Sequence, residues 1–222
     1  MDTVKKIFSA ITLSCLFLLP CISYAEEKSD AYFVVEAGML GKGNFENIAK
    51  QEIIKEKPEA KNMKMKSGSA FLVRFAGNMP YSLFNARYGI AIDGGGTPSM
   101  EFSAKYYSWS SAYYSQTFGD GMILRFMFTN EYFVIGSAKE GRGLAIYTGA
   151  GFSGLYEMQL GEDTLLDTKD YSGISYDYGL KCYIRFAPDF SATIGAVKSV
   201  IIKTGGFSWK TEHIFVGTAV KF

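Results

Sequence analysis

The chain has 222 residues, of which 48% are hydrophobic and 16% aromatic, with 24 glycines, five prolines and a formal net charge of +1. The near balance of charge gives no reason to expect a nucleic-acid partner or a polybasic membrane anchor. Beyond residue 25 no apolar run reaches the roughly 18 to 20 residues of a transmembrane helix, which excludes a helical membrane protein. Abundant aromatic residues and glycine with little proline are typical of many strands joined by turns.

Residues 1–25 have the pattern of a secretory signal peptide. A basic start is followed by an apolar run at residues 7–19, which is too short to span a bilayer. Because Ala25 is a small residue of the kind that signal peptidases require, we expect cleavage between Ala25 and Glu26. Residues 26–222 then suit a single domain, and their acidic and basic residues are in balance.

The cysteines give little chemistry. Cys21 ends a segment that weakly resembles a lipobox, but Pro20 stands where that motif has a small residue, so the lipoprotein alternative is disfavoured. Signal cleavage would leave only Cys182, which excludes an intramolecular disulfide and a cysteine-based metal cluster. We interpret Cys182 as a small apolar filler.

Three segments after the signal peptide alternate between apolar and polar residues with a period of two. They cover residues 32–39, 70–77 and 81–93. Side chains alternate across a strand, so each segment is predicted to be a strand with one apolar face. The expected outward residues are Phe33, Val35, Ala37, Phe71, Val73, Phe75, Phe84, Tyr88, Ile90 and Ile92, and the expected inward ones include Glu36, Arg74, Asn85, Arg87 and Asp93.

The C-terminal half carries longer segments of the same kind, at residues 121–129, 144–160, 171–186, 190–196 and 213–222. Tilted strands need about 9 to 11 residues to cross a bilayer, and several of these segments exceed that length. We therefore expect the apolar faces to contact hydrocarbon and the polar faces to line an interior. Closure into a barrel follows, because unpaired backbone groups in lipid are prohibitively costly. A soluble lipocalin-like barrel is the architectural rival, with the apolar face inward.

The connections predict orientation and strand number. Short turns are expected at residues 78–80 and 187–189, and longer polar connections at 41–67, 161–170 and 203–207. Barrels of this class place short turns in the periplasm and long loops outside. Both termini then lie in the periplasm, which demands an even number of strands. Eight strands are favoured, and ten result if residues 100–107 and 112–118 form a further membrane hairpin.

Three segments carry a family resemblance: residues 68–81 (GSAFLVRFAGNMPY), 146–152 (IYTGAGF) and 215–222 (FVGTAVKF). They resemble the small OmpA/OmpX-type outer-membrane β-barrel family of Gram-negative bacteria, the generic outer membrane protein β-barrel domain, by pattern more than by identity. The resemblance implies an all-β closed antiparallel barrel in the outer membrane. It also implies that Phe222, preceded by Val220, is the signal that the barrel assembly machinery reads. Because the sequence given stops there, tethering to the cell wall is not implied.

The expected interior contains many charges, with acids and bases roughly matched. Buried charges must be paired, so we favour an internal network of salt bridges that fills a narrow barrel. The alternative is a porin-like pore for ions or small solutes. The predicted interior charges are Glu36, Arg74, Arg87, Glu101, Lys105, Arg125, Glu157, Asp177, Lys181 and Arg185.

His213 is the only histidine, so a hydrolase or a metal site would have to include it. Some outer-membrane barrels are lipid A deacylases that use a histidine, a serine and an acid. The residues around His213 do not match the His-x-Ser motif of that family, and Ser208 has the opposite facing parity. We therefore predict no catalytic, cofactor-binding or metal-binding residues, and keep a lipid A-modifying enzyme as an alternative.

Lys198, Lys210 and Glu212 have outward parity near the outer rim. Our hypothesis is that Lys198 and Lys210 contact phosphates of lipopolysaccharide, and the alternative is an ordinary strand end in water. The outer loops are the expected place for contacts with a surface or a host ligand. The sequence thus favours a non-enzymatic envelope scaffold with surface-exposed loops.

Overall fold

The computed structural model describes residues 30–41, 43–44, 47, 51, 64–81, 84–105, 113–119, 121–161, 167–203 and 208–222. The predicted signal peptide and its cleavage site at Ala25 and Glu26 lie outside these residues. Among the described residues, no helix has the length and apolar character needed to cross a membrane. The strands are β1 (Tyr32–Leu40), β2 (Lys64–Ser67), β3 (Ala70–Tyr81), β4 (Ala86–Gly96), β5 (Met100–Lys105), β6 (Tyr113–Gly119), β7 (Met122–Ser137), β8 (Arg142–Gly161), β9 (Asp167–Ala187), β10 (Phe190–Lys203) and β11 (Ser208–Lys221).

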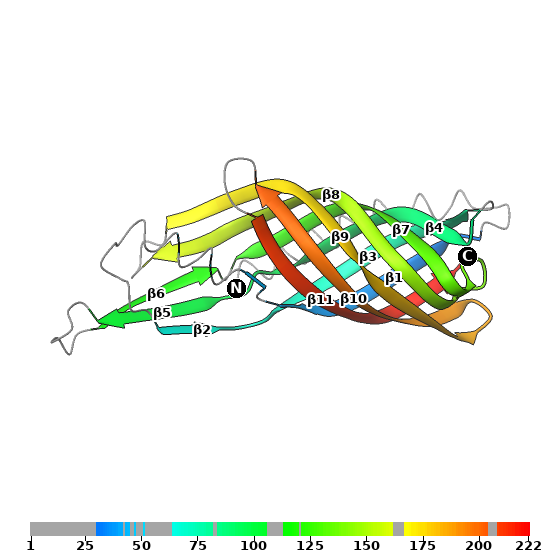
Figure 1. Cartoon of the computed structure of the whole chain (residues 1–222), viewed down its shortest axis with the longest axis horizontal. Coiled ribbons are helices and arrows are strands. Elements are labelled where there is room, and N and C mark those ends of the chain that lie inside the picture. The colour runs from blue at the N-terminus through cyan, green and yellow to red at the C-terminus, as the bar shows by residue number, and fades with distance from the viewer. Residues whose placement is uncertain are drawn as a thin grey trace.

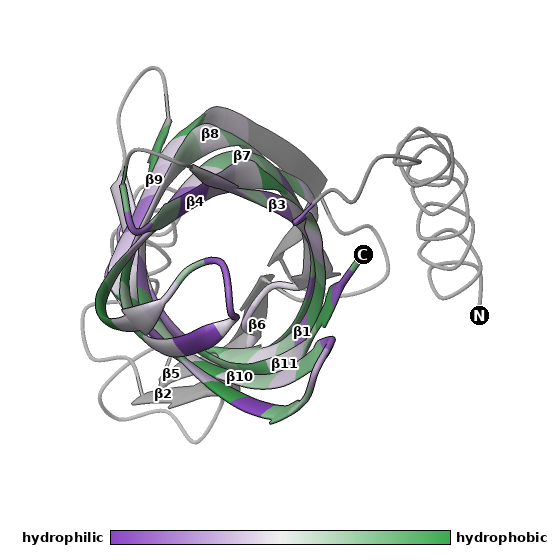
Figure 2. Ribbon diagram, turned by 90° about the vertical axis from the view of Figure 1, so that its right-hand side faces the viewer, coloured by the Kyte–Doolittle hydropathy of each residue, from purple (hydrophilic) through white to green (hydrophobic). Residues whose placement is uncertain are grey.

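Eight of these strands form a closed antiparallel barrel in the order β1, β3, β4, β7, β8, β9, β10, β11 (Figure 1). Each strand pairs with the one that follows it around the wall. The ring is closed by β1 and β11, which pair from Tyr32 with Lys221 to Leu40 with His213. Figure 2 shows the ring from its end. The predicted eight-stranded barrel is confirmed.

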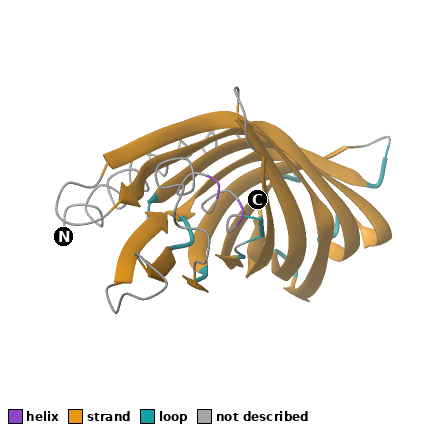
Figure 3. Cartoon of the chain, turned by 60° about the vertical axis from the view of Figure 1, so that its left-hand side comes forward, coloured by secondary structure: helices purple, strands orange, loops and turns teal. Residues whose placement is uncertain are grey.

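The ten-strand alternative is wrong. β4 and β7 pair directly, from Ala86 with Tyr132 to Gly96 with Met122, so no edge in the wall is open to a further hairpin there. Strands β5 and β6 instead pair with each other, with β2 and with the far end of β8. They form a small sheet that projects beyond the barrel (Figure 3). The connection between β4 and β7 therefore contains two strands, β5 and β6, but they lie outside the barrel wall.

The two ends of the barrel differ. At one end, which we call the turn end, the strands are joined by short connections at residues 82–85, 138–141 and 188–189. Both ends of the described chain lie there, since the Phe222 amide donates to the Ala31 carbonyl at 2.9 Å. The other end, the loop end, carries the longer connections and the projecting sheet. By the general rule for outer-membrane barrels, we expect the turn end to face the periplasm.

One predicted turn is wrong and one was missed. The turn expected at residues 78–80 lies four residues later, because β3 continues through Pro80 to Tyr81. Beyond Asn78, β3 pairs only with β4, so a residue without an N–H is tolerated at this free edge. The turn at residues 138–141 falls after a strand that runs well past Thr129, where the alternation was expected to end. The expected turn around Pro188 is present.

Side chains alternate between the two faces of the wall as the sequence predicts. The outward residues are apolar and exposed, for example Phe128 at 58%, Phe152 at 66% and Ile214 at 62%. The inward residues include nearly all of the buried charges of the described chain. A register shift between Leu155 and Met158 interrupts the pairing of β8 with β9 near the end of β8. The hydrophobic surface of this protein is thus on its outside.

Glycines on the inner face let neighbouring strands approach closely. A Cβ added at Gly217 would lie 2.0 Å from the Val35 carbonyl oxygen and 2.7 Å from the Cα of Glu36. The Glu36 side chain fills the space above this glycine, its partner across the β1–β11 seam. Gly77, on the outer face, would place a Cβ in open space. Small inward residues therefore make room for large inward neighbours, as narrow barrels require.

We expect Gly217→Ala to destabilise the barrel by about 1 to 3 kcal/mol, because the added methyl group must push the two strands of the seam apart. Gly77→Ala is the matched control and should change stability by less than about 0.5 kcal/mol. Urea unfolding in detergent micelles, followed by tryptophan fluorescence and by the gel shift of unboiled samples, measures both. Equal midpoints for the two variants would contradict the close approach at Gly217.

Candidate functional site: the charged interior of the barrel

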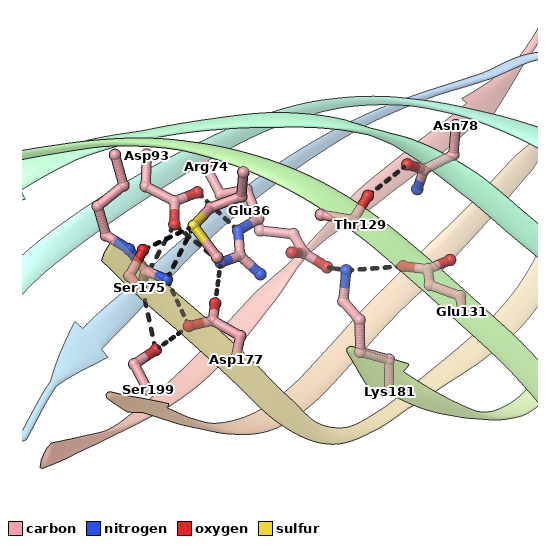
Figure 4. Close-up of polar contacts among 12 residues, drawn as sticks. Glu36, Arg74, Asn78, Asp93, Thr129, Glu131, Ser175, Asp177, Lys181 and Ser199 are labelled. Atoms are coloured by element: carbon pink, nitrogen blue, oxygen red, sulfur yellow. Dashed lines mark hydrogen bonds and ion pairs between the residues drawn. The ribbon is translucent and has the colours of Figure 1, made fainter. Parts of the chain in front are cut away.

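Two arginines and two aspartates form a cluster in the half of the barrel nearer the loop end (Figure 4). We call Arg74, Asp93, Arg125 and Asp177 the loop-side cluster. Arg74 binds Asp93 with two hydrogen bonds, Nε to Oδ1 at 2.7 Å and Nη2 to Oδ2 at 2.8 Å, and reaches Asp177 at 3.1 Å. Arg125 also contacts both acids, and Ser199 donates to Asp177. Each charge is therefore shared between two partners of opposite sign.

A second cluster lies nearer the turn end and has a lysine at its centre. The Lys181 ammonium lies 2.8 Å from Glu36 Oε1 and 3.2 Å from Glu131 Oε1. The Tyr183 hydroxyl donates to the same Glu131 oxygen at 2.6 Å. We call Glu36, Glu131 and Lys181 the turn-side cluster. Its lysine bridges β1 and β7 across the interior.

Arg87 is the remaining buried cation of the described interior. Its Nε and Nη2 donate to the Ala138 carbonyl at 2.8 and 2.6 Å, and its guanidinium lies 3.5 Å from the centre of the Tyr32 ring. With Arg87 included, the buried and described charges are four basic and four acidic. This balance matters because an unmatched charge in a dry interior is strongly destabilising.

The turn end of the barrel is filled. Ala138 is buried, and the turn that contains it bends into the barrel mouth, where the Tyr32 hydroxyl donates to the Lys139 carbonyl at 2.7 Å. The Ser191 hydroxyl donates to the Gly141 carbonyl at 2.6 Å. The rings of Phe133 and Tyr183 are also buried there, 5.4 Å apart. We call this group of residues the turn-end plug.

The loop end of the interior is closed by apolar side chains. They stand on the side of the loop-side cluster that faces the loops, and each is at most 3% exposed. The members of this apolar layer are Leu40, Leu72, Ile123, Leu155, Ile201 and Trp209. Both charge clusters therefore lie between an apolar layer and a plug.

Six of the ten predicted interior charges are buried in the barrel: Glu36, Arg74, Arg87, Arg125, Asp177 and Lys181. Arg185 is not among them, because it is exposed at the turn end and donates to the carbonyls of Ala187 and Pro188. The side chains of Glu101, Lys105 and Glu157 lie outside the described part of the chain.

Two acids of the clusters are missing from the predicted charge network: Asp93, which was predicted to face inward but was not included in the network, and Glu131. The alternation of β4 places Asp93 inward. Its cross-strand neighbour Arg125 is also inward and has the opposite charge, which could have indicated that the two residues pair. Glu131 lies two residues beyond the predicted end of its strand at Thr129. A longer alternation that continued to Phe133 would have found it.

His213 is buried inside the barrel, stacked on Phe215 with ring centroids 5.5 Å apart. Neither ring nitrogen has a hydrogen-bond partner among the described residues. Ser208 lies on the opposite face of β11, as the parity predicts. Within the described chain, no group of three or more histidine, cysteine, aspartate or glutamate side chains is placed to hold a metal ion.

The outward lysines differ in their surroundings. Lys198 and Glu212 form an exposed ion pair across β10 and β11, with Nζ and Oε1 3.2 Å apart. Lys210 is exposed, and its backbone is held by Asn44, whose Oδ1 accepts from the Lys210 amide at 2.6 Å. Of the two predicted lipopolysaccharide contacts, Lys198 therefore has an ion-pair partner. For Lys210 the described part of the chain shows none.

The C-terminus is joined to the start of β1. Asp30 lies 2.6 Å from the Lys221 ammonium and 3.2 Å from that of Lys139. The hydrogen bond from Lys221 is the largest influence on the Asp30 carboxyl and holds its pKa below the ordinary value. Phe222 itself is half exposed, and Val220 pairs with Phe33 and Phe190.

An apolar outer wall around a polar, charge-paired interior defines a transmembrane β-barrel, because only hydrocarbon around the wall makes that arrangement favourable. The chain is accordingly an eight-stranded barrel of the bacterial outer-membrane type. No protein-family model matches the sequence, and no curated protein is significantly similar to it.

Several solved outer-membrane barrels are similar in fold. OprG from Pseudomonas aeruginosa matches with a TM-score of 0.49 and 10% identity over 88% of this chain and 97% of that chain. Neisserial surface protein A matches at 0.47 and 13% over 89% and 100%. The N-terminal barrel domain of Pseudomonas aeruginosa OprF matches at 0.46 and 11% over 88% and 100%. Because these TM-scores and identities are low, the assignment of the architecture depends on the closed ring of strands seen in this chain itself.

We expect Arg74→Ala to destabilise the barrel by about 3 to 5 kcal/mol, because Asp93 and Asp177 would then share one cation in a dry interior. Lys198→Ala, which breaks an exposed pair, is the control and should cost no more than about 1 kcal/mol. Urea unfolding of folded protein in micelles measures the difference. A similar small loss for both variants would mean that the loop-side cluster is hydrated and only weakly coupled.

Proposed function

We propose that the protein is a non-enzymatic scaffold of the outer membrane whose barrel is sealed and whose loop end contacts envelope lipids, other surfaces or host molecules. The observation that carries this proposal is the closed interior, in which balanced charges lie between the apolar layer and the turn-end plug. A conducting pore needs a continuous hydrated path, and a deacylase needs its catalytic base at the lipid-facing surface. The buried charge clusters and the burial of His213 inside the barrel support the scaffold over both alternatives.

The projecting sheet supports a role at the loop end. Strands β8 and β9 continue past the barrel and carry β6, β5 and β2 beside them (Figure 1). Such an extension adds nothing to the closure of the wall. It does provide a rigid platform for recognition outside the membrane, the usual place for binding surfaces on a barrel.

A sealed scaffold should not conduct ions in planar bilayers. The apolar layer and the turn-end plug lie in series, and Arg87 holds the plug by donating to the Ala138 carbonyl. We therefore expect Trp209→Ala and Arg87→Ala each to stay insulating and the double variant to conduct. Recordings from equal amounts of folded protein, checked by gel shift, test this. Steady channels from the wild-type protein would favour the porin-like alternative instead.

The enzymatic alternative places its chemistry at His213. The burial of this ring inside the barrel, stacked on Phe215, supports a structural role. Mass spectrometry of lipid A from cells with and without the protein should give identical spectra. A mass shift that disappears in His213→Ala would overturn the scaffold proposal.

We propose further that Lys210 is the main contact with lipopolysaccharide phosphate, and that Lys198 contributes less because Glu212 already neutralises it. Lys210→Ala should lower the thermal stabilisation that added lipopolysaccharide gives the folded protein by at least half. Lys139→Ala, at the turn end, is the control and should leave it unchanged. Equal effects of the two variants would indicate unspecific attraction to charge.

The proposed assembly signal comprises Phe222 and Val220, as the family resemblance implies. Phe222 is half exposed and its amide donates to the Ala31 carbonyl at the edge of the wall, so we expect removal of its ring to cost little packing. Deletion of Phe222 should nevertheless lower the heat-modifiable fraction in outer membranes several-fold. The same variant should still refold from urea in detergent, where no machinery acts; normal assembly in cells would exclude the signal.

A further inference from the structure

A row of polar side chains crosses the apolar outer wall of the barrel. Cross-strand pairing places six outward and exposed residues next to one another, one on each of six successive strands. The neighbouring rows on either side are dominated by apolar residues, such as Phe128 and Ala150 above and Tyr132 and Ile146 below. The members of this polar row, from β4 to β11, are Tyr88, Asn130, Thr148, Tyr178, Lys198 and Glu212.

The row is oblique to the membrane plane. Because strands tilt by about 40° in such barrels and lie about 4.8 Å apart, each step to the next strand climbs about 3 Å along the barrel axis. Lys198 and Glu212 therefore lie near the outer rim, where their charges are tolerated. Asn130 and Thr148 lie much deeper in the apolar band.

Along its own strand, Asn130 is flanked by apolar and aromatic side chains on the outer face. The other outward residues of β7 between Met122 and Val134 are apolar or aromatic, and Asn130 lies four residues from Val134. At about 2.5 Å of axial rise per residue, this is about 10 Å from the inner edge of an apolar band about 25 Å high. The side chains of Asn130 and Thr148 both face outward and are exposed, so they project from the wall into the hydrocarbon. Polar side chains in hydrocarbon are costly unless a partner satisfies them.

We propose that Asn130 and Thr148 form the centre of a contact with a second copy of this chain in the membrane. In a symmetric dimer of copies inserted in the same direction, the two-fold axis runs along the membrane normal, so each residue lies at the same depth as its equivalent in the second copy. An asparagine amide both donates and accepts, and it can therefore pair with itself. Lys198 already forms an ion pair with Glu212 of the same chain, so the upper end of the row has less need of a partner from a second copy.

The oblique course of the row fixes how far this contact extends. The rows of two facing copies incline in opposite directions across the interface, so they cross at one depth only. The crossing at Asn130 and Thr148 leaves Phe128, Tyr132, Ile146 and Ala150 to pack around it. Interhelical hydrogen bonds between small polar residues hold membrane helices together in the same way.

A disulfide trap tests the contact in native outer membranes. Cys182 is first replaced by alanine, because it is the only cysteine after residue 25. Asn130→Cys in that background should form a disulfide-linked dimer on mild oxidation. Val216→Cys is the matched control, since it also faces lipid but stands on β11, four strands away around the ring and so opposite to β7.

Three results would overturn the proposal: no cross-link at position 130, equal yields at positions 130 and 216, or a cross-link from position 130 to a different protein. A second pair of variants does not depend on cysteine chemistry. Asn130→Leu should lower the dimer fraction at least fivefold in sedimentation analysis in detergent, while Asn130→Gln should retain it. Both should keep the heat-modifiable gel shift, because the side chain lies outside the barrel; an unchanged dimer fraction in Asn130→Leu would also overturn the proposal.

Discussion

The requirement that every backbone group in the membrane be hydrogen-bonded governs this structure. An open sheet has two edges, and each would expose a row of unpaired amides and carbonyls to hydrocarbon. The pairing of β1 with β11 along the whole length of β1 removes both edges at once. The position of the termini at one end and the even number of strands both follow from this single closure, and the direct pairing of β4 with β7 keeps the β5–β6 hairpin out of the wall.

Closure of a narrow ring creates a second constraint, because the inward side chains must then fill a confined space. The solution here combines glycines that let strands approach, charges that neutralise one another and apolar groups at both ends. Arg74 and Arg125 each contact two acids, so the loop-side cluster connects β3, β4, β7 and β9 through side chains as well as through the backbone. The interior therefore contributes to the rigidity of the wall.

The sequence was sufficient for the barrel because alternation over long strands is a repeated signal that many residues share. It was insufficient at strand ends. Pro80 resembles a turn residue, and only the register of β1 shows that the edge beside it is free. Arg185 has the same inward parity as Lys181. It lies at the turn end of β9, beyond the filled interior, where an inward parity no longer means that the side chain is buried. The pairing of the interior charges depends on distances between side chains across the ring. The alternation of apolar and polar residues along a strand does not predict these distances.

Strands β8 and β9 have 20 and 21 residues, which at about 3.3 Å per residue and a tilt of about 40° reach about 50 Å along the barrel axis. An apolar band about 25 Å high accounts for half of that reach. The other half extends past the apolar band as a ladder of β8 and β9 that carries the projecting sheet and is interrupted by one register shift, between Leu155 and Met158. A molecule that bound at its tip would be held clear of the lipid surface, and any pull on it would be transmitted as shear along the ladder directly to the wall.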